Sequence, residues 1–498
     1  MSERHQADLS PRPSSRKIAF GASALGVVSI AKMLLQMAAL PVMARLLGPT
    51  EFGLYAIAIP IVAFVGTLSD GGLGVSLVKE PESSSIWSTA FWALLGIGIV
   101  LAACLTGAGF ALGVLLHQPR LPGIMAALSV TIVLMTITVP PVARLDRQGR
   151  IAVGAGSDLL GNILGTCFGI FLAFHGAGAW SLVGQYVTIY VMRALVCNCA
   201  AFKMPKMEFH PAALISHLAT GGFVVGVRIS DFAGRMLENI GLSHVLGTAA
   251  VGLYAFSNQI PRFISETFSN PLWLSLYIRA LREEKAEIVA LHRQFSRLLG
   301  MILFPVTALF LVTAPALIPM FLGPKWVSAA PLLQILLPAY VLNVIGSQNG
   351  AVLLACNRYD IQLYCTIGAS IGKVLAVCLA PWIGLIGVAY GVAGVNAIYA
   401  IVMIFGSAAI TGCEALPVLR GLAGPLAASL FAGTIGRAAV GPALLNYGSG
   451  NIGDLVLCLT IGTVAYIAAI VLLDRKHLAS DLTLLKNVLR PRRVSPAS

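Results

Sequence analysis

The sequence predicts an all-α polytopic membrane protein of about 14 transmembrane helices, arranged as two pseudo-symmetric six-helix lobes plus two appended helices. Hydrophobic residues make up 57% of the 498 residues, charged residues only 11%, and the mean hydropathy is +0.87. Soluble domains carry roughly 25% charge. Apolar runs of about 20 residues, each long enough to cross about 30 Å of hydrocarbon, recur along the chain. The segment LGPTEFGLYA at residues 47–56 returns as LGTAAVGLYA at residues 246–255, which indicates an internal duplication.

The apolar runs and the breaks between them locate the individual helices. Each segment has the length of a membrane span, and short polar or glycine-containing stretches separate them. The expected helices cover residues 18–43, 53–77, 86–116, 122–142, 154–174, 178–199, 213–238, 248–275, 298–321, 330–355, 361–381, 385–410, 419–440 and 452–473.

The duplication divides this series into lobes. Two six-helix repeats around a central path are a common plan of transporters. The last two helices have no counterpart in the duplication and are interpreted as appended. We therefore expect a basic tail at residues 1–17, an N-lobe at 18–205, a C-lobe at 206–414, appended helices at 415–473, and a second basic tail at 474–498.

The distribution of Lys and Arg predicts the orientation. These residues gather in the two tails and in the loops on one side, whereas the opposite side holds only Arg45, Arg120 and Lys325. Cytoplasmic loops carry this excess of positive charge. We expect both termini in the cytoplasm of a bacterial inner membrane. The net charge of +13 is then mainly a topology signal, and no nucleic-acid partner is expected.

Basic residues inside the expected helices are the candidates for substrate binding. A charge at membrane depth costs roughly 2.5–3.5 kcal/mol on insertion scales and usually faces a bundle interior or a watery cavity. The candidate cations are Lys32, Arg228, Arg235, Arg262 and Lys373. Lys32 and Lys373 have no acid near them in sequence, so each is expected either to line a ligand cavity or to pair with an acid on a distant helix.

Acidic residues in the same helices are candidates for coupling transport to an H⁺ or Na⁺ gradient. They are Asp70, Asp158, Asp231 and Glu238. Arg228, Asp231, Arg235 and Glu238 follow one another at spacings of three, four and three, which places them on one helical face. Ion pairing within that face is the alternative to ligand binding, as it is for Arg262 with Glu266.

Other features point away from catalysis and metal binding. Gly71, Gly72 and Gly74 lie within an expected helix rather than at a strand-to-helix turn, so no nucleotide site is predicted. The nine Cys are scattered through apolar runs and are interpreted as packing residues. Arg193 and Arg437 lie near helix ends and are expected to extend toward the membrane surface. We expect no catalytic residue, metal or cofactor.

Several motifs carry a resemblance to a known family. They are ARLLGP at residues 44–49 with FGLY at 52–55, SDGGLG at 69–74, and LGPKW at 322–326. With these motifs the chain resembles the Wzx-type oligosaccharide flippases, the polysaccharide transporters of the multidrug/oligosaccharidyl-lipid/polysaccharide exporter superfamily. The resemblance covers residues 18 to about 473.

The resemblance implies a function. It implies translocation of polyprenyl-pyrophosphate-linked oligosaccharide repeat units by alternating access, for exopolysaccharide or lipopolysaccharide biosynthesis. The implied partners are the lipid-linked oligosaccharide, membrane lipids, a polysaccharide polymerase and the export machinery. The positive excess among the membrane charges fits a pyrophosphate headgroup, because Arg and Lys bind phosphate through charge-assisted hydrogen bonds.

Three alternatives remain. A cation or drug antiporter of the same superfamily would be expected to have a negative cavity. A membrane polysaccharide polymerase or ligase would be expected to carry a large outer loop with catalytic side chains, and every expected outer loop here is short. A structural scaffold would leave the charges in the membrane without a reason.

Overall fold

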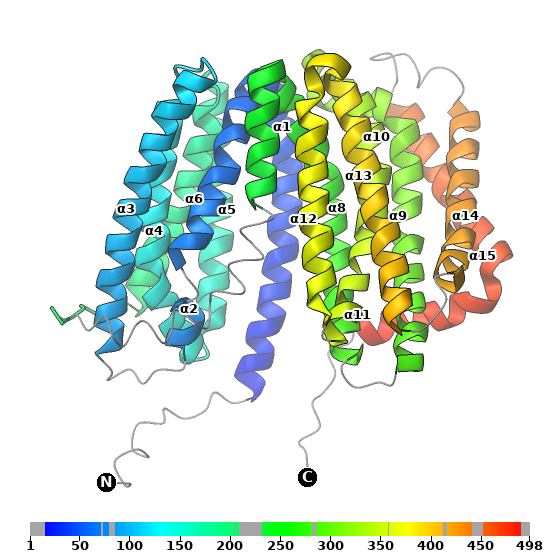
Figure 1. Ribbon diagram of the computed structural model, residues 1–498, viewed down its shortest axis with the longest axis horizontal. Helices are drawn as coiled ribbons and strands as arrows, with labels where there is room; N and C mark the ends of the chain where they lie inside the picture. Colours follow the sequence, from blue (N-terminus) through cyan, green and yellow to red (C-terminus); the bar gives the residue numbers. More distant parts are fainter. Residues whose placement is uncertain are drawn as a thin grey trace, which may run out of the picture. The chain divides into compact units, whose positions relative to one another are not determined.

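The computed structural model describes residues 15–70, 73–78, 85–201, 203–208, 232–280, 285–356, 358–411, 416–440 and 452–489. All regular secondary structure in these residues is helical, and most of the helices are long rods (Figure 1). The chain forms two compact units, Met1–Gly252 and Leu253–Ser498. The lobe boundary expected between residues 205 and 206 stays a prediction, because residues 209–231 lie outside the described part of the chain.

Unit 1 begins with a helix that is broken by a glycine. Helix α1 (Ser15–Asp70) has 56 residues and contains a non-helical residue, Gly48, with φ 77° and ψ 169°. A side chain disfavours this backbone conformation, so glycine is the residue that permits the break. The break lies within the first copy of the repeated segment and separates the first two expected helices.

The other helices of unit 1 pack as a bundle. They are α2 (Leu73–Leu77), α3 (Ile86–Leu115), α4 (Leu121–Arg147), α5 (Ile151–Phe174) and α6 (Trp180–Ala201), followed by a helix over residues 232–246 and the start of α8 (Thr248–Ala280). The main pairs are α3 with α4, α5 with α6, and α4 with α6, and α1 packs on α5 and α4.

Small residues bring α5 and α6 close together. Gly161, Gly165 and Gly169 follow one another at four-residue intervals, and a Cβ on any of them would press on α6, at Ile189 or Gln185. Small residues at this spacing let two membrane helices approach closely, because van der Waals packing replaces the hydrophobic driving force there. The spacing therefore fixes which face of α5 meets α6.

Unit 2 repeats part of this pattern. Its helices are α9 (Lys285–Leu322), the 3₁₀ turn η1 (Pro324–Trp326), α10 (Ala329–Ser347), α11 (Asn349–Ala355), α12 (Tyr359–Cys378), α13 (Ala380–Thr411), α14 (Leu416–Val440) and α15 (Ile452–Leu489). The pairs α9 with α10, α12 with α13, and α10 with α13 correspond in chain order to the three main pairs of unit 1. Helices α14 and α15 pack on each other and on α9.

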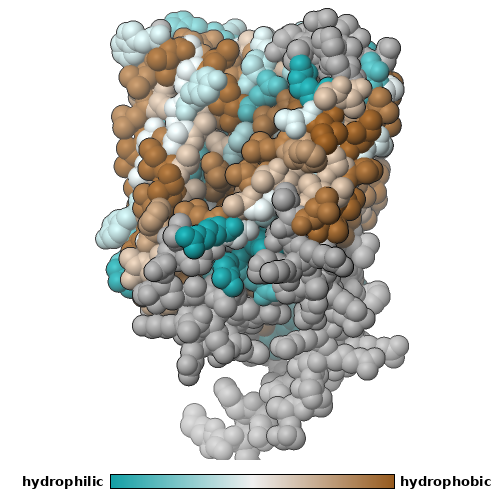
Figure 2. Space-filling model, turned by 90° about the vertical axis from the view of Figure 1, so that its right-hand side faces the viewer, coloured by the Kyte–Doolittle hydropathy of each residue, from teal (hydrophilic) through white to brown (hydrophobic). Residues whose placement is uncertain are grey.

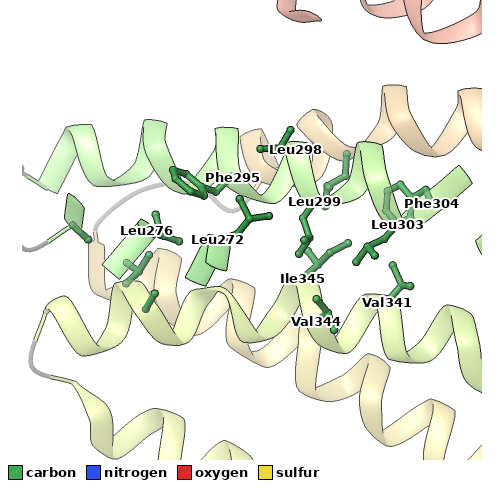
Figure 3. Packing of buried hydrophobic residues seen from close by; sticks show 14 residues of the cluster. Leu272, Leu276, Phe295, Leu298, Leu299, Leu303, Phe304, Val341, Val344 and Ile345 are labelled. Carbon is green, nitrogen blue, oxygen red and sulfur yellow. The ribbon is translucent and has the colours of Figure 1, made fainter. Parts of the chain in front are cut away.

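A hydrophobic cluster joins the helices of unit 2. Figure 3 shows Leu272 and Leu276 of α8 beside Phe295, Leu299 and Leu303 of α9. Side chains of α10 complete the cluster from the other side. The buried residues of the cluster are at most 8% exposed, so the cluster is a packed core.

Eleven segments of the described residues are long and apolar enough to cross a membrane. The first, Val28–Ser69, covers 42 residues and includes the larger part of both expected helices on either side of Gly48. Helix α8 is not among the eleven, and the expected helix 213–238 lies largely outside the described residues. The coloured residues on the face of unit 2 seen in Figure 2 are mainly hydrophobic, as a lipid-facing surface should be.

Several helices extend past their expected boundaries: α9 begins at Lys285 rather than at residue 298, and α4 ends at Arg147 rather than at residue 142. Helix α15 continues to Leu489, past the end expected at residue 473. Leucines recur in the added segment, and no Gly or Pro interrupts it before Pro491, so helical hydrogen bonding can continue beyond the apolar run.

Candidate functional site

Three helices of unit 1 bring charged side chains together at membrane depth. Asp158 of α5 lies between Lys32 of α1, whose Nζ is 3.9 Å from Oδ2, and Arg193 of α6, whose Nε is 3.3 Å from Oδ1. The three side chains are 32%, 28% and 37% exposed in the order Lys32, Asp158 and Arg193. Two cations thus share one carboxylate, and we call these three residues the ionic cluster.

Amide side chains continue the ionic cluster by one helical turn. Gln36 of α1 donates from Nε2 to Oδ1 of Asn162 on α5 at 3.3 Å, and Asn162 donates to the Asp158 carbonyl at 2.7 Å. Lys32 and Gln36 are four residues apart, as are Asp158 and Asn162, so each pair lies on one helical face. This spacing holds α1 and α5 in register along two polar contacts.

The depth of the ionic cluster follows from the turns at one end of unit 1. Lys32 precedes the break at Gly48, and Asp158 precedes the end of α5, each by about 24 Å at 1.5 Å per residue. Asp158 is also about 10 Å from the start of α5 at Ile151, so it lies inside the span, in hydrocarbon or in a polar cavity, rather than at either end. Its partial exposure therefore needs water or a polar ligand nearby.

Tyrosine hydroxyls lie nearer the Gly48 end. Tyr186 and Tyr190 of α6 have ring centroids 4.9 Å apart and a hydroxyl contact of 3.4 Å. Tyr55 of α1 lies near both phenols. On the same helix, Gln185 donates to Thr166 of α5 at 3.2 Å.

A carboxylate clamp closes the Gly48 end itself. Glu51 accepts two hydrogen bonds from Arg120, at 2.7 and 3.0 Å, and one from the backbone N of Ala179 at 2.6 Å. These residues follow the break in α1, precede α4 and precede α6, in that order. One side chain thus ties together three inter-helix turns.

The remaining candidate cations have varied surroundings. Arg235, half-buried in the helix 232–246, has its guanidinium carbon 4.7 Å from the ring centre of Phe232. Arg262 on α8 and Lys373 on α12 are half-buried in unit 2. Within the described residues, Lys373 forms no hydrogen bond or ion pair.

The acidic candidates are less completely described. Glu238 is 8% exposed, and its neighbour Asn239 donates to the Ala56 carbonyl at 2.7 Å. Asp70 is the last residue of α1, and the structure describes its backbone but not its side chain. Arg228 and Asp231 lie outside the described residues altogether.

The structure thus adds residues that sequence reasoning did not select. Arg193 was expected to extend toward the membrane surface, and instead contacts Asp158. Tyr186, Tyr190, Arg193 and Cys197 recur at spacings of four, three and four, which is one stripe of α6. That spacing was the available signal for a polar face. No sequence spacing indicated Glu51 with Arg120.

Together, the long apolar helices and the charges held between them define a multi-pass helical membrane protein with a polar site inside its first unit. The chain belongs to the family described as polysaccharide biosynthesis protein, whose model matches residues 42–331, more than half of the sequence.

Similarity to named relatives covers most of the chain. It is 24% identical to the lipopolysaccharide biosynthesis protein WzxC of Escherichia coli, with 70% of this chain and 72% of WzxC covered. It is 25% identical to the succinoglycan biosynthesis transport protein ExoT of Rhizobium meliloti, with 93% and 94% covered. The structure resembles the lipid II flippase MurJ in an inward closed conformation, with a TM-score of 0.73 at 11% identity over 91% of this chain and 99% of MurJ. At that identity the likeness concerns the fold.

Proposed function

We propose that the protein translocates polyprenyl-pyrophosphate-linked oligosaccharide repeat units across the bacterial inner membrane, for exopolysaccharide or lipopolysaccharide biosynthesis. The family match and the names of WzxC and ExoT support this class of activity. The observation that supports a pyrophosphate-linked substrate is the ionic cluster, in which two cations contact one carboxylate at membrane depth. The excess cation suits a pyrophosphate, which offers several acceptor oxygens.

The mechanism we propose is alternating access between two lobes. Fourteen helices, six in each lobe and two appended, would provide a path that opens to one side of the membrane at a time. The matching helix pairs in units 1 and 2 support this duplication. In this arrangement the protein has no catalytic residue, and both termini lie in the cytoplasm.

The same observations weigh against the two rival functions. A cation or drug antiporter needs an excess of negative charge at its site, whereas Lys32 and Arg193 both contact Asp158, and Asp146 is the further acid that acts on Arg193. A polymerase or ligase needs catalytic side chains on an outer loop. The described turns at the Gly48 end are short, and their main charged contact is the clamp of Glu51 with Arg120.

Reconstituted protein provides the direct test. Lys32→Gln and Arg193→Gln should each remove one charge-assisted contact, worth about 1.5–3 kcal/mol, and lower the affinity for undecaprenyl pyrophosphate tenfold or more. Translocation of a lipid-linked oligosaccharide into proteoliposomes should fall correspondingly. Lys325→Gln is the matched control, because Lys325 is exposed in the turn η1. Undiminished translocation after neutralising Lys32, Arg193, Arg228, Arg235, Arg262 and Lys373 together would refute the cationic site.

Energy coupling is a separate part of the proposal. We propose that one of Asp70, Asp158, Asp231 and Glu238 exchanges H⁺ or Na⁺ during the transport cycle. No cofactor is needed for such an exchange. Translocation should then depend on an imposed H⁺ or Na⁺ gradient across the proteoliposome membrane, and gradient-independent transport would remove all four acids from this role.

A further inference from the structure

The polar stripe of α6 continues past the ionic cluster toward the Gly48 end. Arg193 is followed in that direction by Tyr190 and then Tyr186, and three or four residues separate successive members. At 1.5 Å per residue, the Tyr190 backbone lies about 4.5 Å along the helix from Arg193, and that of Tyr186 about 10 Å. A ligand that reached Arg193 from the opposite end would meet the tyrosines next.

The three phenols have hydrogen-bonding capacity to spare. Tyr186 and Tyr190 share one long contact of 3.4 Å, and within the described residues the Tyr55 hydroxyl has no hydrogen-bond partner. The Tyr55 oxygen is not fully enclosed by the described residues, so a ligand or water can reach it. Each phenol can donate one hydrogen bond and accept others. In lipid such hydroxyls would lack partners, so their spare capacity indicates a polar ligand or water.

The surrounding side chains match the chemistry of a sugar. Half-buried aromatic faces can pack against the C–H groups of a pyranose, because the negative face of a ring attracts its slightly positive hydrogens. Phenol and amide groups bind its hydroxyls, and such groups usually fix ligand orientation in polar pockets. Gln185, held by Thr166, adds an amide on the next residue of α6.

From this arrangement we propose that Tyr55, Tyr186 and Tyr190 form a saccharide subsite that binds the first sugar of the lipid-linked substrate. The inference rests on the proposed function, since it places the pyrophosphate at Lys32 and Arg193. The first sugar is attached directly to that pyrophosphate, so it must lie next to the ionic cluster. The tyrosines occupy that position on the Gly48 side. The ionic cluster then binds the pyrophosphate headgroup, and the tyrosines distinguish a glycosylated lipid from a bare one.

The test compares two ligands on the purified full-length protein. The probes are undecaprenyl pyrophosphate and the same lipid bearing one glucose or one galactose. Wild-type protein should bind the tighter of the two glycosylated probes about tenfold more strongly than the bare lipid. Tyr190→Ala should reduce this preference to within about twofold, while the affinity for the bare lipid stays within twofold of wild type. Tyr364→Ala, an exposed tyrosine of α12, is the control.

The outcomes separate the two proposals. Wild-type protein that binds no bare undecaprenyl pyrophosphate contradicts the proposed function. Binding of the bare lipid without a preference for either glycosylated probe overturns the saccharide subsite, as does an unchanged preference in Tyr190→Ala. If Tyr190→Ala does not fold, the double variant Tyr55→Phe, Tyr186→Phe keeps the rings and removes two hydroxyls. Its preference should fall at least threefold, and an unchanged preference overturns the inference.

Discussion

Gly53 and Gly252 approach each other through backbone alone. A Cβ on Gly53 would collide with the carbonyl oxygen of Thr248, and a Cβ on Gly252 would collide with that of Pro49. Each glycine therefore faces the carbonyl four residues before the other. Both occupy the same position of the repeated segment, 47–56 and 246–255, so the two copies contact each other through their equivalent residues.

This contact makes either glycine intolerant of a methyl group. Gly53→Ala and Gly252→Ala should each destabilise the protein by about 1–3 kcal/mol, because a backbone carbonyl must move rather than a flexible side chain. Thermal unfolding in detergent should show a lower midpoint for both variants. Gly107→Ala on α3 is the matched control, since a Cβ there meets nothing within 4 Å. Equal midpoints for all three variants would contradict the close approach.

The clamp at Glu51 should contribute more to stability than an ordinary surface ion pair. Arg120 is 46% exposed, but Glu51 is 24% exposed and also accepts the backbone hydrogen bond of Ala179. Glu51→Ala should cost about 1–2 kcal/mol, because three inter-helix turns lose their common acceptor. Asp360→Asn is the control, since its pair with Arg358 joins near neighbours in sequence. A midpoint lowered equally by both changes would show that the clamp has no special role.

Asp158 should act as an internal competitor of the substrate headgroup. Asp158→Asn leaves Lys32 and Arg193 without their shared carboxylate, so ligand-free protein should be less stable. Undecaprenyl pyrophosphate should bind more tightly, because it no longer displaces a carboxylate from the two cations. The thermal shift caused by this lipid should therefore be larger in Asp158→Asn than in wild type. Asp454→Asn on α15 should leave the shift unchanged, and a smaller shift in Asp158→Asn would contradict the proposed competition.

Orientation can be tested with introduced cysteines in a cysteine-free background. Thr50 and His175 are exposed in turns at the Gly48 end, and Met204 is exposed beyond the opposite end of α6. The positive-inside distribution predicts that cysteines at positions 50 and 175 react with an impermeant reagent in intact spheroplasts. A cysteine at position 204 should react only after permeabilisation. The reverse pattern would invert the topology.

Much of the helical fold was predictable because its cause is local in sequence. The expected helix at 86–116 corresponds to α3 (Ile86–Leu115), and that at 154–174 to α5 (Ile151–Phe174). A run of apolar residues must form a helix in hydrocarbon, since every backbone hydrogen bond has to be made within the segment. Boundaries shifted where helices run beyond the apolar run, as α15 does. Backbone hydrogen bonding does not stop where hydropathy changes.

The candidate site was only partly predictable. The cost of charge in a membrane singled out Lys32 and Asp158 by type and position, and it left open whether Lys32 would meet a ligand or a distant acid. The contact with Asp158 depends on α1 lying against α5. Arg193 was assigned to the surface because it lies near a helix end, and the polar stripe that it shares with Tyr186 and Tyr190 was not used.

The two tyrosines of the repeated segment illustrate the division. The sequence by itself determined that the chain forms many membrane helices, contains a repeated segment and carries basic residues within its apolar runs, because hydropathy, repetition and charge are properties of the order of residues. Tyr55 and Tyr254 occupy equivalent positions in the two copies of the repeated segment. Only the tertiary structure made them different: Tyr254 is 2% exposed in a packed core, and Tyr55 lies half-buried beside Tyr186 and Tyr190. The environment of a side chain depends on which helices surround it. Helix packing determines which residues far apart in sequence become neighbours.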